Sequence, residues 1–226
     1  MQHKDFTIIC GHYGCGKTNL SINLALDAAA SGRRTVLVDF DIVNPYFRSS
    51  DYVGLLREKG VRLIAPAYAR STIDLPMLPP EVHSIFGSSD VVIVDVGGDD
   101  AGATVLGSFS DRLQGRDYDM LYVVNKHRPL SATATLSLAL LREVERASHL
   151  KATAIVNNSH LMQDSTAETI LGASAFAEET SVAAGLPLRA TVVPRFLAGC
   201  VGEALAGDTY YVDIYVRPPW TEPGVP

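Results

Sequence analysis

The sequence feature that most limits the possible folds is the glycine-rich segment 11–18. It reads Gly-His-Tyr-Gly-Cys-Gly-Lys-Thr and satisfies the pattern GxxxxGK[ST] at every position. A strand-like apolar run (FTIIC, 6–10) leads directly into it, and a helical pattern follows it. The glycines let the backbone wrap around an anion with its N–H groups inward, and the helix adds the positive end of its dipole. The segment therefore predicts a phosphate-binding loop.

Short apolar runs alternate with helical patterns along the rest of the chain. Several runs are apolar on consecutive residues, which is typical of strands buried on both faces of a parallel sheet. We therefore expect a single-domain, doubly wound α/β fold with a mostly parallel sheet of seven to eight strands and helices on both faces. The expected strands are 6–10, 35–39, 61–64, 91–96, 120–124, 152–156 and 189–193, and the expected helices are 17–31, 51–59, 131–149, 165–184 and 197–206.

The domain is expected to cover residues 1–216, with residues 210–216 as an edge strand of the same sheet or an interface. The proline-rich tail 217–226 is expected to be extended. Segment 66–90 carries four prolines and predicts a loop with a short helix, either a specificity element or a simple connection.

Composition excludes several classes of protein. Apolar residues make up 47% of the chain and charged residues 19%, which is globular, and the net charge of −6 argues against a general nucleic-acid or membrane surface. Three cysteines without pairing or zinc spacing argue against a disulfide scaffold. No signal peptide or span of about 18 apolar residues is apparent, so a cytoplasmic location is expected.

Carboxylates stand at two further strand ends, as a site for Mg²⁺ and phosphate requires. Asp39 and Asp41 lie at the end of one strand, and Asp95 lies near the end of another. In a parallel sheet these ends share one edge with the phosphate loop. Lys17 would reach the β- and γ-phosphates, and the hydroxyl of Thr18 would bind Mg²⁺.

Two glycines follow Asp95, namely Gly97 and Gly98. Either could bring a backbone N–H to the γ-phosphate, because neither has a side chain in the way. The simpler alternative for Asp39 and Asp41 is that they cap a turn before Pro45.

In order along the chain, the stretches GHYGCGKTNLSINLA, RTVLVDFDIVNP, VVIVDVGG, YVVNKHRPLSAT, AIVNN and VVPRFLAGCVGEALAG resemble the MinD/ParA family of deviant-Walker P-loop ATPases. The resemblance runs from residue 6 to about residue 207. It implies ATP and Mg²⁺ as cofactors, Asp41 as the group that orients the attacking water, and Asp39, Asp95 and Thr18 near the metal. The nucleotide-binding residues it implies are Gly11, Gly14, Cys15, Gly16, Lys17, Thr18, Asn19, Asn157 (with Asn158 as an adjacent candidate) and Pro194.

The chain departs from the family at His12 and Tyr13. The family has a second lysine at the first of these positions, which contacts the nucleotide of the partner subunit. A neutral imidazole lacks that constant positive charge. A homodimer of the family's type therefore stays open, with His12 arguing against it.

The segment Asn125-Lys126-His127-Arg128 only partly matches the guanine-reading pattern NKxD, because Arg128 replaces the aspartate. The hypothesis from the sequence is an ATP-binding protein with slow hydrolysis that acts as a switch toward an unidentified partner. Gly97, Gly98 and segment 66–90 would carry the switch. Two alternatives stay open: an ATP-dependent enzyme acting on a small carboxylate, resembling dethiobiotin synthetase or the amidases of cobyrinic acid synthesis, and a nucleotide-regulated binding module without turnover.

Overall fold

A computed structural model describes residues 1–41, 52–66, 78–98, 100–201, 205 and 207–216 of the chain. The predicted tail at 217–226 lies outside the described residues, as do residues 67–77 of the proline-rich segment. No helix in the described ranges has the length and apolar content that a membrane crossing requires.

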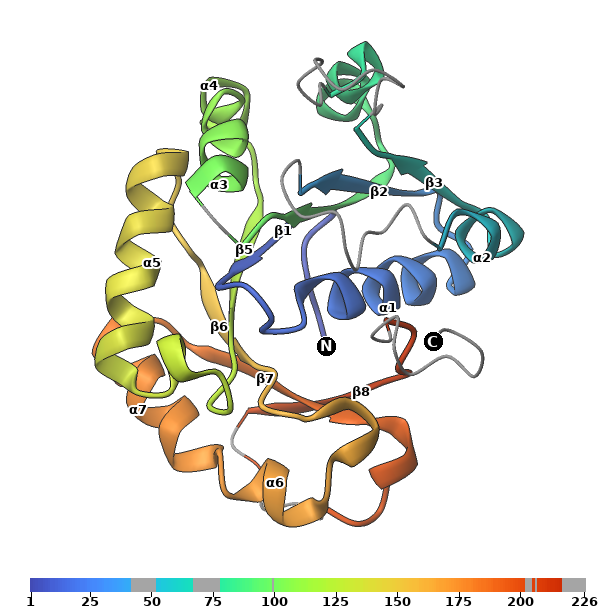
Figure 1. The fold of residues 1–226 in the computed structure, drawn as a ribbon. Coiled ribbons are helices and arrows are strands. Elements are labelled where there is room, and N and C mark those ends of the chain that lie inside the picture. The colour runs from blue at the N-terminus through green and yellow to red at the C-terminus, as the bar shows by residue number, and fades with distance from the viewer. Residues whose placement is uncertain (42–51, 67–77, 99, 202–204, 206, 217–226) are drawn as a thin grey trace, which may run out of the picture.

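One eight-stranded sheet runs through the molecule, with every strand pair parallel (Figure 1). The strands lie in the order β3-β2-β4-β1-β5-β6-β7-β8. They are β1 (Phe6–Gly11), β2 (Thr35–Phe40), β3 (Val61–Ile64), β4 (Val91–Val96), β5 (Asp119–Val124), β6 (Ala154–Asn157), β7 (Leu188–Pro194) and β8 (Asp208–Val212). The expected doubly wound α/β architecture is confirmed, and β8 supplies the expected edge strand.

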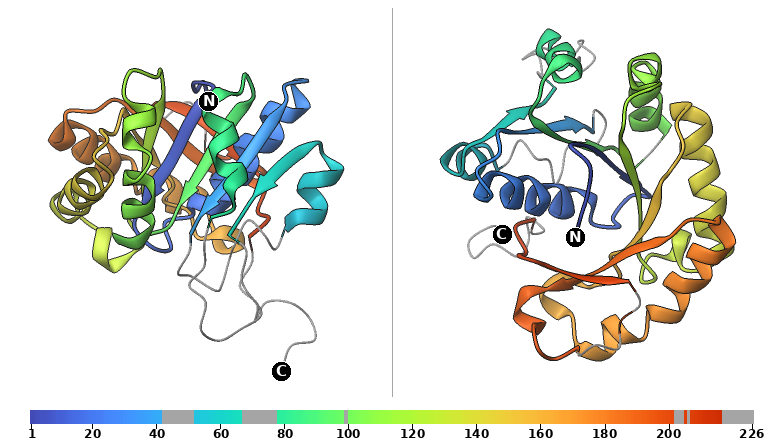
Figure 2. Two further views of the ribbon diagram at one scale, coloured as in Figure 1. Left: turned by 90° about the horizontal axis from the view of Figure 1, so that it is seen from above. Right: turned by 180° about the vertical axis from the view of Figure 1, so that it is seen from behind.

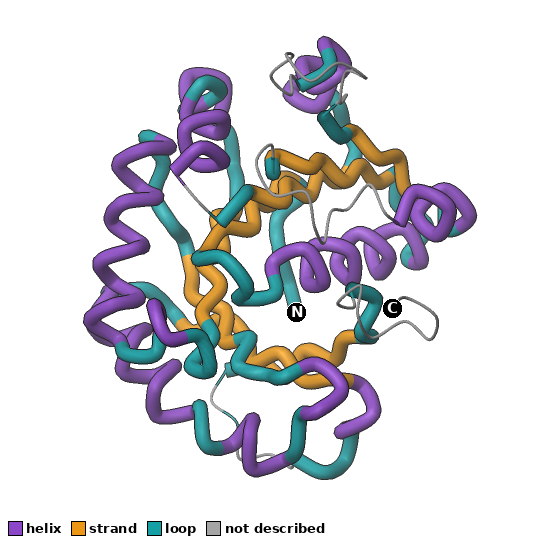
Figure 3. Tube along the Cα trace, in the orientation of Figure 1, coloured by secondary structure: helices purple, strands orange, loops and turns teal. Residues whose placement is uncertain are grey.

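Helices cover both faces of the curved sheet. They are α1 (Lys17–Ala30), α2 (Val53–Glu58), α3 (Asp100–Gly107), α4 (Ser110–Leu113), α5 (Ala134–Ser148), α6 (Ala167–Leu171) and α7 (Ser174–Ala184), with 3₁₀ turns η2 (Pro80–Gly87), η3 (Pro129–Ser131), η4 (Met162–Asp164) and η5 (Arg195–Leu197). Helix α1 lies inside the curve of the sheet, and α5 and α7 lie outside it (Figures 1 and 3).

The alternation of side chains along each strand explains why both faces are apolar. On β1, Ile8 packs in a core cluster with Leu141 of α5, whereas the adjacent Ile9 packs with Leu20 of α1. Successive strand residues point to opposite faces, so a strand between two helix layers must be apolar at every position. The strands run side by side and begin at the edge where the N-terminus lies (Figure 2).

Several predicted helix bounds were wrong. The helix expected at 197–206 is absent in the described part of that range, where η5 ends at Leu197 and Gly199 has φ +84°, a value that a helix does not accommodate. The helix expected at 165–184 is divided into α6 and α7. Helices α3 and α4 were not predicted. The short helix expected within 66–90 is the 3₁₀ turn η2.

Polar side chains on α1 hold the segment that follows β8. Asn19 and Asn23 each donate from Nδ2 to the carbonyl oxygen of Asp213, at 3.0 and 2.9 Å. Oδ1 of Asn19 accepts the N–H groups of Tyr215 at 2.8 Å and Val216 at 3.2 Å. Asparagines four positions apart share one face of a helix. This face therefore fixes residues 213–216 beside the start of α1.

Candidate nucleotide site

A cavity of about 290 Å³ opens at the carboxyl-terminal edge of the sheet. This is the edge at which ligands bind in open parallel sheets. Its wall combines the loop after β1, the end of β2, the loops after β5 and β6, and the segment after β8. The lining residues are Tyr13, Gly14, Gly16, Lys17, Thr18, Asn19, Asp41, Asn125, Arg128, Asn158, His160, Met162 and Val216.

The predicted phosphate loop forms one wall of this cavity. Nε of Arg128 donates to the carbonyl oxygen of Gly14 at 2.7 Å, and Nδ2 of Asn158 donates to that of Cys15 at 2.6 Å. The backbone N–H groups of Gly14, Gly16 and Thr18 donate to no acceptor in the described part of the chain. Two carbonyl oxygens of the loop are thus occupied by side chains, whereas these N–H groups can still donate. The loop therefore has the polarity that an anion requires.

Gly16 must be a glycine for this arrangement to exist. It has φ +89°, and a Cβ atom there would collide with Nδ2 of Asn158. Cys15, next to it, is fully buried, and burial raises the pKa of its thiol. Cys15 therefore acts as a small apolar residue of the loop rather than as a reactive thiolate.

Lys17 lies in the cavity wall at the end of the predicted phosphate loop. Its Nζ donates to the carbonyl oxygen of His12 at 3.2 Å, and the residue is buried at the cavity wall. A Cβ atom at Gly98 would lie 2.9 Å from this Nζ and 2.6 Å from Cα of Tyr13. The second predicted glycine, Gly97, packs against Gly102 of α3. The loop after β4 therefore touches the phosphate loop on one side and α3 on the other.

The three predicted carboxylates lie together at the ends of β2 and β4. Asp39 and Asp95 are register partners, and Oδ1 of Asp39 accepts the N–H of Asp41 at 2.9 Å. Ser21 of α1 donates to Oδ1 of Asp95 at 3.3 Å. Burial raises the pKa of Asp95 to about 6, while Lys17 and a hydrogen bond from Thr18 act against that rise.

These carboxylates suit a metal ion that is bound partly by protein oxygens and partly by phosphate oxygens. Among the described residues, no three His, Cys, Asp or Glu side chains gather as a metal site. Thr18 lies next to the buried Asp95, and Mg²⁺ is commonly held by one or two protein oxygens together with phosphate oxygens and water. The residues present therefore fit Mg²⁺ bound together with a nucleotide.

The other end of the cavity differs from the sequence expectation. Asn157 is fully buried behind the cavity wall, where its Nδ2 donates to Oγ1 of Thr191 at 3.4 Å. Its neighbour Asn158 lines the cavity, and Pro194, the last residue of β7, does not. The roles predicted for Asn157 and Pro194 stay predictions. Of the two adjacent asparagines, Asn158 is the one beside the ligand space.

Sequence reasoning missed His160 and did not assign Arg128 to the site. His160 is the last residue of the run Asn-Asn-Ser-His at the end of β6. A polar run directly after a buried strand is the sequence signal that could have indicated it. The ring of His160 is buried, and Nδ1 accepts the N–H of Met162 at 3.1 Å. Burial, followed by the charges of Arg128 and His127, lowers the pKa of His160 to about 4. The ring is therefore neutral at pH 7.

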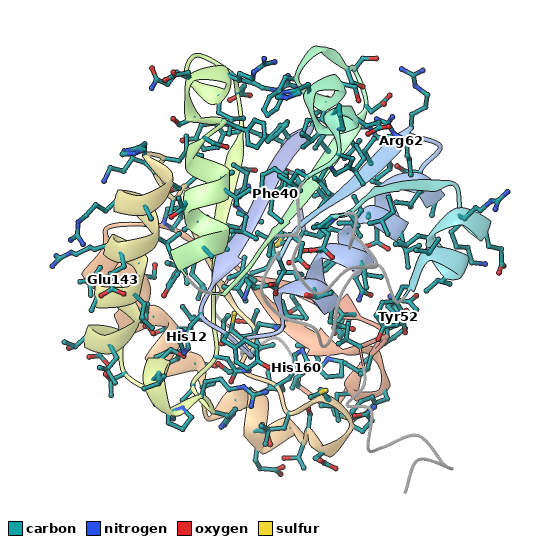
Figure 4. The ribbon with its side chains drawn as sticks, turned by 45° about the horizontal axis from the view of Figure 1, so that its top comes forward. His12, Phe40, Tyr52, Arg62, Glu143 and His160 are labelled. Atoms are coloured by element: carbon teal, nitrogen blue, oxygen red, sulfur yellow. The ribbon has the colours of Figure 1, made fainter. Side chains whose placement is uncertain are left out.

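The structure also bears on the departure at His12 and Tyr13. His12 is half-buried, and burial together with the charge of Lys17 lowers its pKa. It therefore carries no constant positive charge at neutral pH. Tyr13 is exposed at the mouth of the cavity. Figure 4 labels His12 and His160, which both lie at the edge where the strands end.

Neither a protein-family model nor a curated protein matches the sequence. Among solved structures, the match to FtsY from the chloroplast of Physcomitrella patens covers 84% of this chain and 59% of the FtsY chain, with 15% sequence identity and a TM-score of 0.54. The signal recognition particle 54 kDa protein from Aeropyrum pernix K1, in complex with GDP, matches 81% of this chain and 40% of its own, with 16% identity and a TM-score of 0.53. FtsY from Thermotoga maritima matches 85% of this chain and 63% of its own, with 18% identity and a TM-score of 0.50.

These comparisons support the fold and no more. The chain spans between 40% and 63% of the length of the three proteins it matches. At identities of 15–18%, similarity shows shared architecture and not shared substrates or partners. The chain has the P-loop NTPase fold.

Gly98→Ala should disturb the phosphate loop, because the added Cβ meets the backbone of Tyr13 and Nζ of Lys17. We expect a loss of about 1–3 kcal/mol in the free energy of unfolding. Gly54→Ala in the exposed part of α2 is the matched control, since a Cβ there meets nothing within 4 Å. Urea unfolding of both variants measures the effect. Equal stabilities of Gly98→Ala and wild type would contradict the contact.

Burial of neutral His160 should make stability depend on pH. The unfolded side chain has a pKa near 6.5 and the folded one about 4, so the unfolded chain binds the extra proton between these values. This contribution is fully present above pH 6.5 and is lost as the pH falls toward 4. Between pH 7.5 and pH 4.5, the free energy of unfolding should fall for both proteins. The fall should be roughly 2–3 kcal/mol larger for wild type than for His160→Gln. Parallel pH profiles for the two proteins would contradict the assignment.

Proposed function

We propose that this chain binds ATP with Mg²⁺ in the cavity, hydrolyses it slowly, and acts as a nucleotide switch of the MinD/ParA type. The observation that carries the proposal is the loop at 11–18, where Arg128 and Asn158 hold the carbonyls of Gly14 and Cys15 while the N–H groups of Gly14, Gly16 and Thr18 meet no acceptor among the described residues. A loop of this kind, followed by Lys17 and Thr18, is suited to a nucleoside triphosphate.

The order of the strands separates a phosphate end from a base end. Asp41 follows β2, the phosphate loop follows β1, and Asn158 follows β6 in the order β2-β4-β1-β5-β6. The triphosphate would therefore lie toward Asp41 and the base toward Asn158 and the segment ending at Val216. The structure from Aeropyrum pernix holds GDP. Of the described residues that line this cavity, the one carboxylate is Asp41, at the phosphate end, so the described part of the base end offers none to the N1–H and N2–H donors of a guanine.

Each residue of the phosphate end has a role in hydrolysis. Lys17 would leave the carbonyl of His12 and bind the β- and γ-phosphate oxygens. Asp41 would hold the attacking water by accepting a hydrogen bond from it. When bound, Mg²⁺ held by Thr18 and Asp95 neutralises charge on the phosphates. A carboxylate that orients the water without strongly activating it is consistent with slow turnover.

The glycines after β4 would report the state of the nucleotide. Gly98 contacts Tyr13 and Lys17, and Gly97 contacts Gly102 in α3. A γ-phosphate bonded to the N–H of Gly97 or Gly98 would shift this loop, and the close packing on Gly102 would pass the shift to α3. A protein partner would then recognise α3 and segment 66–90, of which residues 67–77 lie outside the described residues.

Lys17→Ala tests the proposal directly. Removing the ammonium group should weaken binding of Mg²⁺-ATP by at least tenfold and abolish phosphate release, because the charge on the β- and γ-phosphates loses its main protein counter-charge. Calorimetric titration and a phosphate-release assay measure both effects. Lys59→Ala, at an exposed lysine beyond α2, is the control and should match wild type.

Unchanged ATP turnover in Lys17→Ala would refute the proposal. Turnover that rises only when a small carboxylate metabolite is added would instead favour the biosynthetic enzyme. Tight ATP binding by wild type without any phosphate release would favour the binding module.

A further inference from the structure

Two buried polar atoms in the cavity wall have no protein partner. They are Oδ1 of Asn158 and Nε2 of His160, neither of which finds a hydrogen-bond partner among the described residues. Asn158 is 1% exposed and His160 is 5% exposed, and both line the cavity. Buried polar atoms are rarely left without partners, because the loss of their hydrogen bonds to water is costly. Such a pair in a ligand cavity indicates that a ligand supplies the missing partners.

The hydrogen bonds that these two side chains make determine which of the remaining atoms donates and which accepts. The carbonyl oxygen of Cys15 can only accept, so the amide atom of Asn158 that faces it is Nδ2, and the remaining atom is the acceptor Oδ1. Nδ1 of His160 accepts the N–H of Met162, so the proton of the neutral ring resides on Nε2. The cavity therefore presents one acceptor and one donor from positions 158 and 160.

Hydrogen bonds fix the backbone of the turn that carries both residues. The N–H of His160 donates to the carbonyl oxygen of Asn158 at 2.9 Å, which closes a tight turn after β6. The carbonyl oxygen of His160 accepts from Nδ2 of Asn125 at 3.3 Å, which ties the turn to the loop after β5. Because Asn158 also binds the phosphate loop through Cys15, the turn and the loop form one connected wall. This connected wall carries both of the polar atoms without a partner among the described residues.

We propose that His160, through its Nε2–H, reads an acceptor ring nitrogen of the nucleotide base, while Oδ1 of Asn158 accepts from the adjacent exocyclic amine. This inference rests on the proposed function, because it assigns the base end of that same cavity. Adenine carries an acceptor nitrogen beside its 6-amino group, at N7 on one edge and at N1 on the other. Guanine presents two acceptors, O6 and N7, on the first edge, so Oδ1 would face an oxygen there. The arrangement therefore fits either of these edges of adenine and does not fit the O6/N7 edge of guanine.

The test compares ATP with analogues that lack single atoms of the base. Calorimetric titrations in Mg²⁺ use ATP, 7-deaza-ATP, 1-deaza-ATP, purine riboside triphosphate, GTP and inorganic tripolyphosphate. The proteins are wild type, His160→Phe, which removes the donor, and His160→Gln, which retains one. Leu161→Ala is the matched control on the same turn, since Leu161 does not line the cavity. Thermal unfolding shows whether each variant is folded.

Wild type should bind one of the two deaza analogues at least tenfold more weakly than ATP. His160→Phe should bind ATP at least tenfold more weakly than wild type, and it should no longer distinguish ATP from that analogue. Its affinity for tripolyphosphate should be unchanged. His160→Gln should recover part of the discrimination, and Leu161→Ala should behave as wild type.

Three results would overturn the inference. If wild type binds both deaza analogues as tightly as ATP, no ring nitrogen is read, although the proposed ATP binding survives. If His160→Phe weakens tripolyphosphate as much as ATP, His160 supports the structure rather than reading the base. If wild type binds neither ATP nor tripolyphosphate, the proposed function fails and the inference fails with it.

Discussion

The site depends on two hydrogen bonds that cross from distant parts of the chain to the phosphate loop. Arg128, after β5, holds the carbonyl of Gly14, and Asn158, after β6, holds that of Cys15. A short glycine-rich loop has many accessible conformations, and fixing one of them costs conformational entropy. Side chains that occupy the carbonyls reduce the alternatives to those with N–H groups toward the cavity. The sheet order matters because it places β1, β5 and β6 next to one another.

The same wall connects the two ends of the proposed nucleotide site. Asn158 uses one amide atom for the loop and leaves the other for the ligand, and His160 is bonded to it through the backbone. On the opposite side, Oδ1 of Asn19 accepts hydrogen bonds from the segment after β8. These bonds hold Val216 at the cavity. In the proposed site, phosphate binding and base binding would therefore depend on shared residues rather than on separate modules.

Much of this architecture could be predicted from the sequence because it follows from local patterns. Segment 11–18 satisfies its motif fully, and the apolar runs located seven strands to within two residues at each end. For residues 210–216 the sequence left an edge strand and an interface open, and β8 lies at Asp208–Val212. The helix expected at 197–206 failed because Gly199 takes a positive φ, which the apolar pattern does not reveal. The contact from Arg128 to Gly14 joins residues 114 positions apart, so no local signal contains it. At the end of β6, adjacent residues point to opposite sides, and periodicity alone does not tell Asn157 from Asn158.

The most direct measurement of the central claim is a crystal structure with Mg²⁺ and a non-hydrolysable ATP analogue. The account predicts phosphate oxygens on the N–H groups of Gly14, Gly16 and Thr18, with the bonds from Arg128 and Asn158 to the loop retained. Phosphates bound elsewhere, or a loop that releases both side chains when the analogue binds, would contradict it.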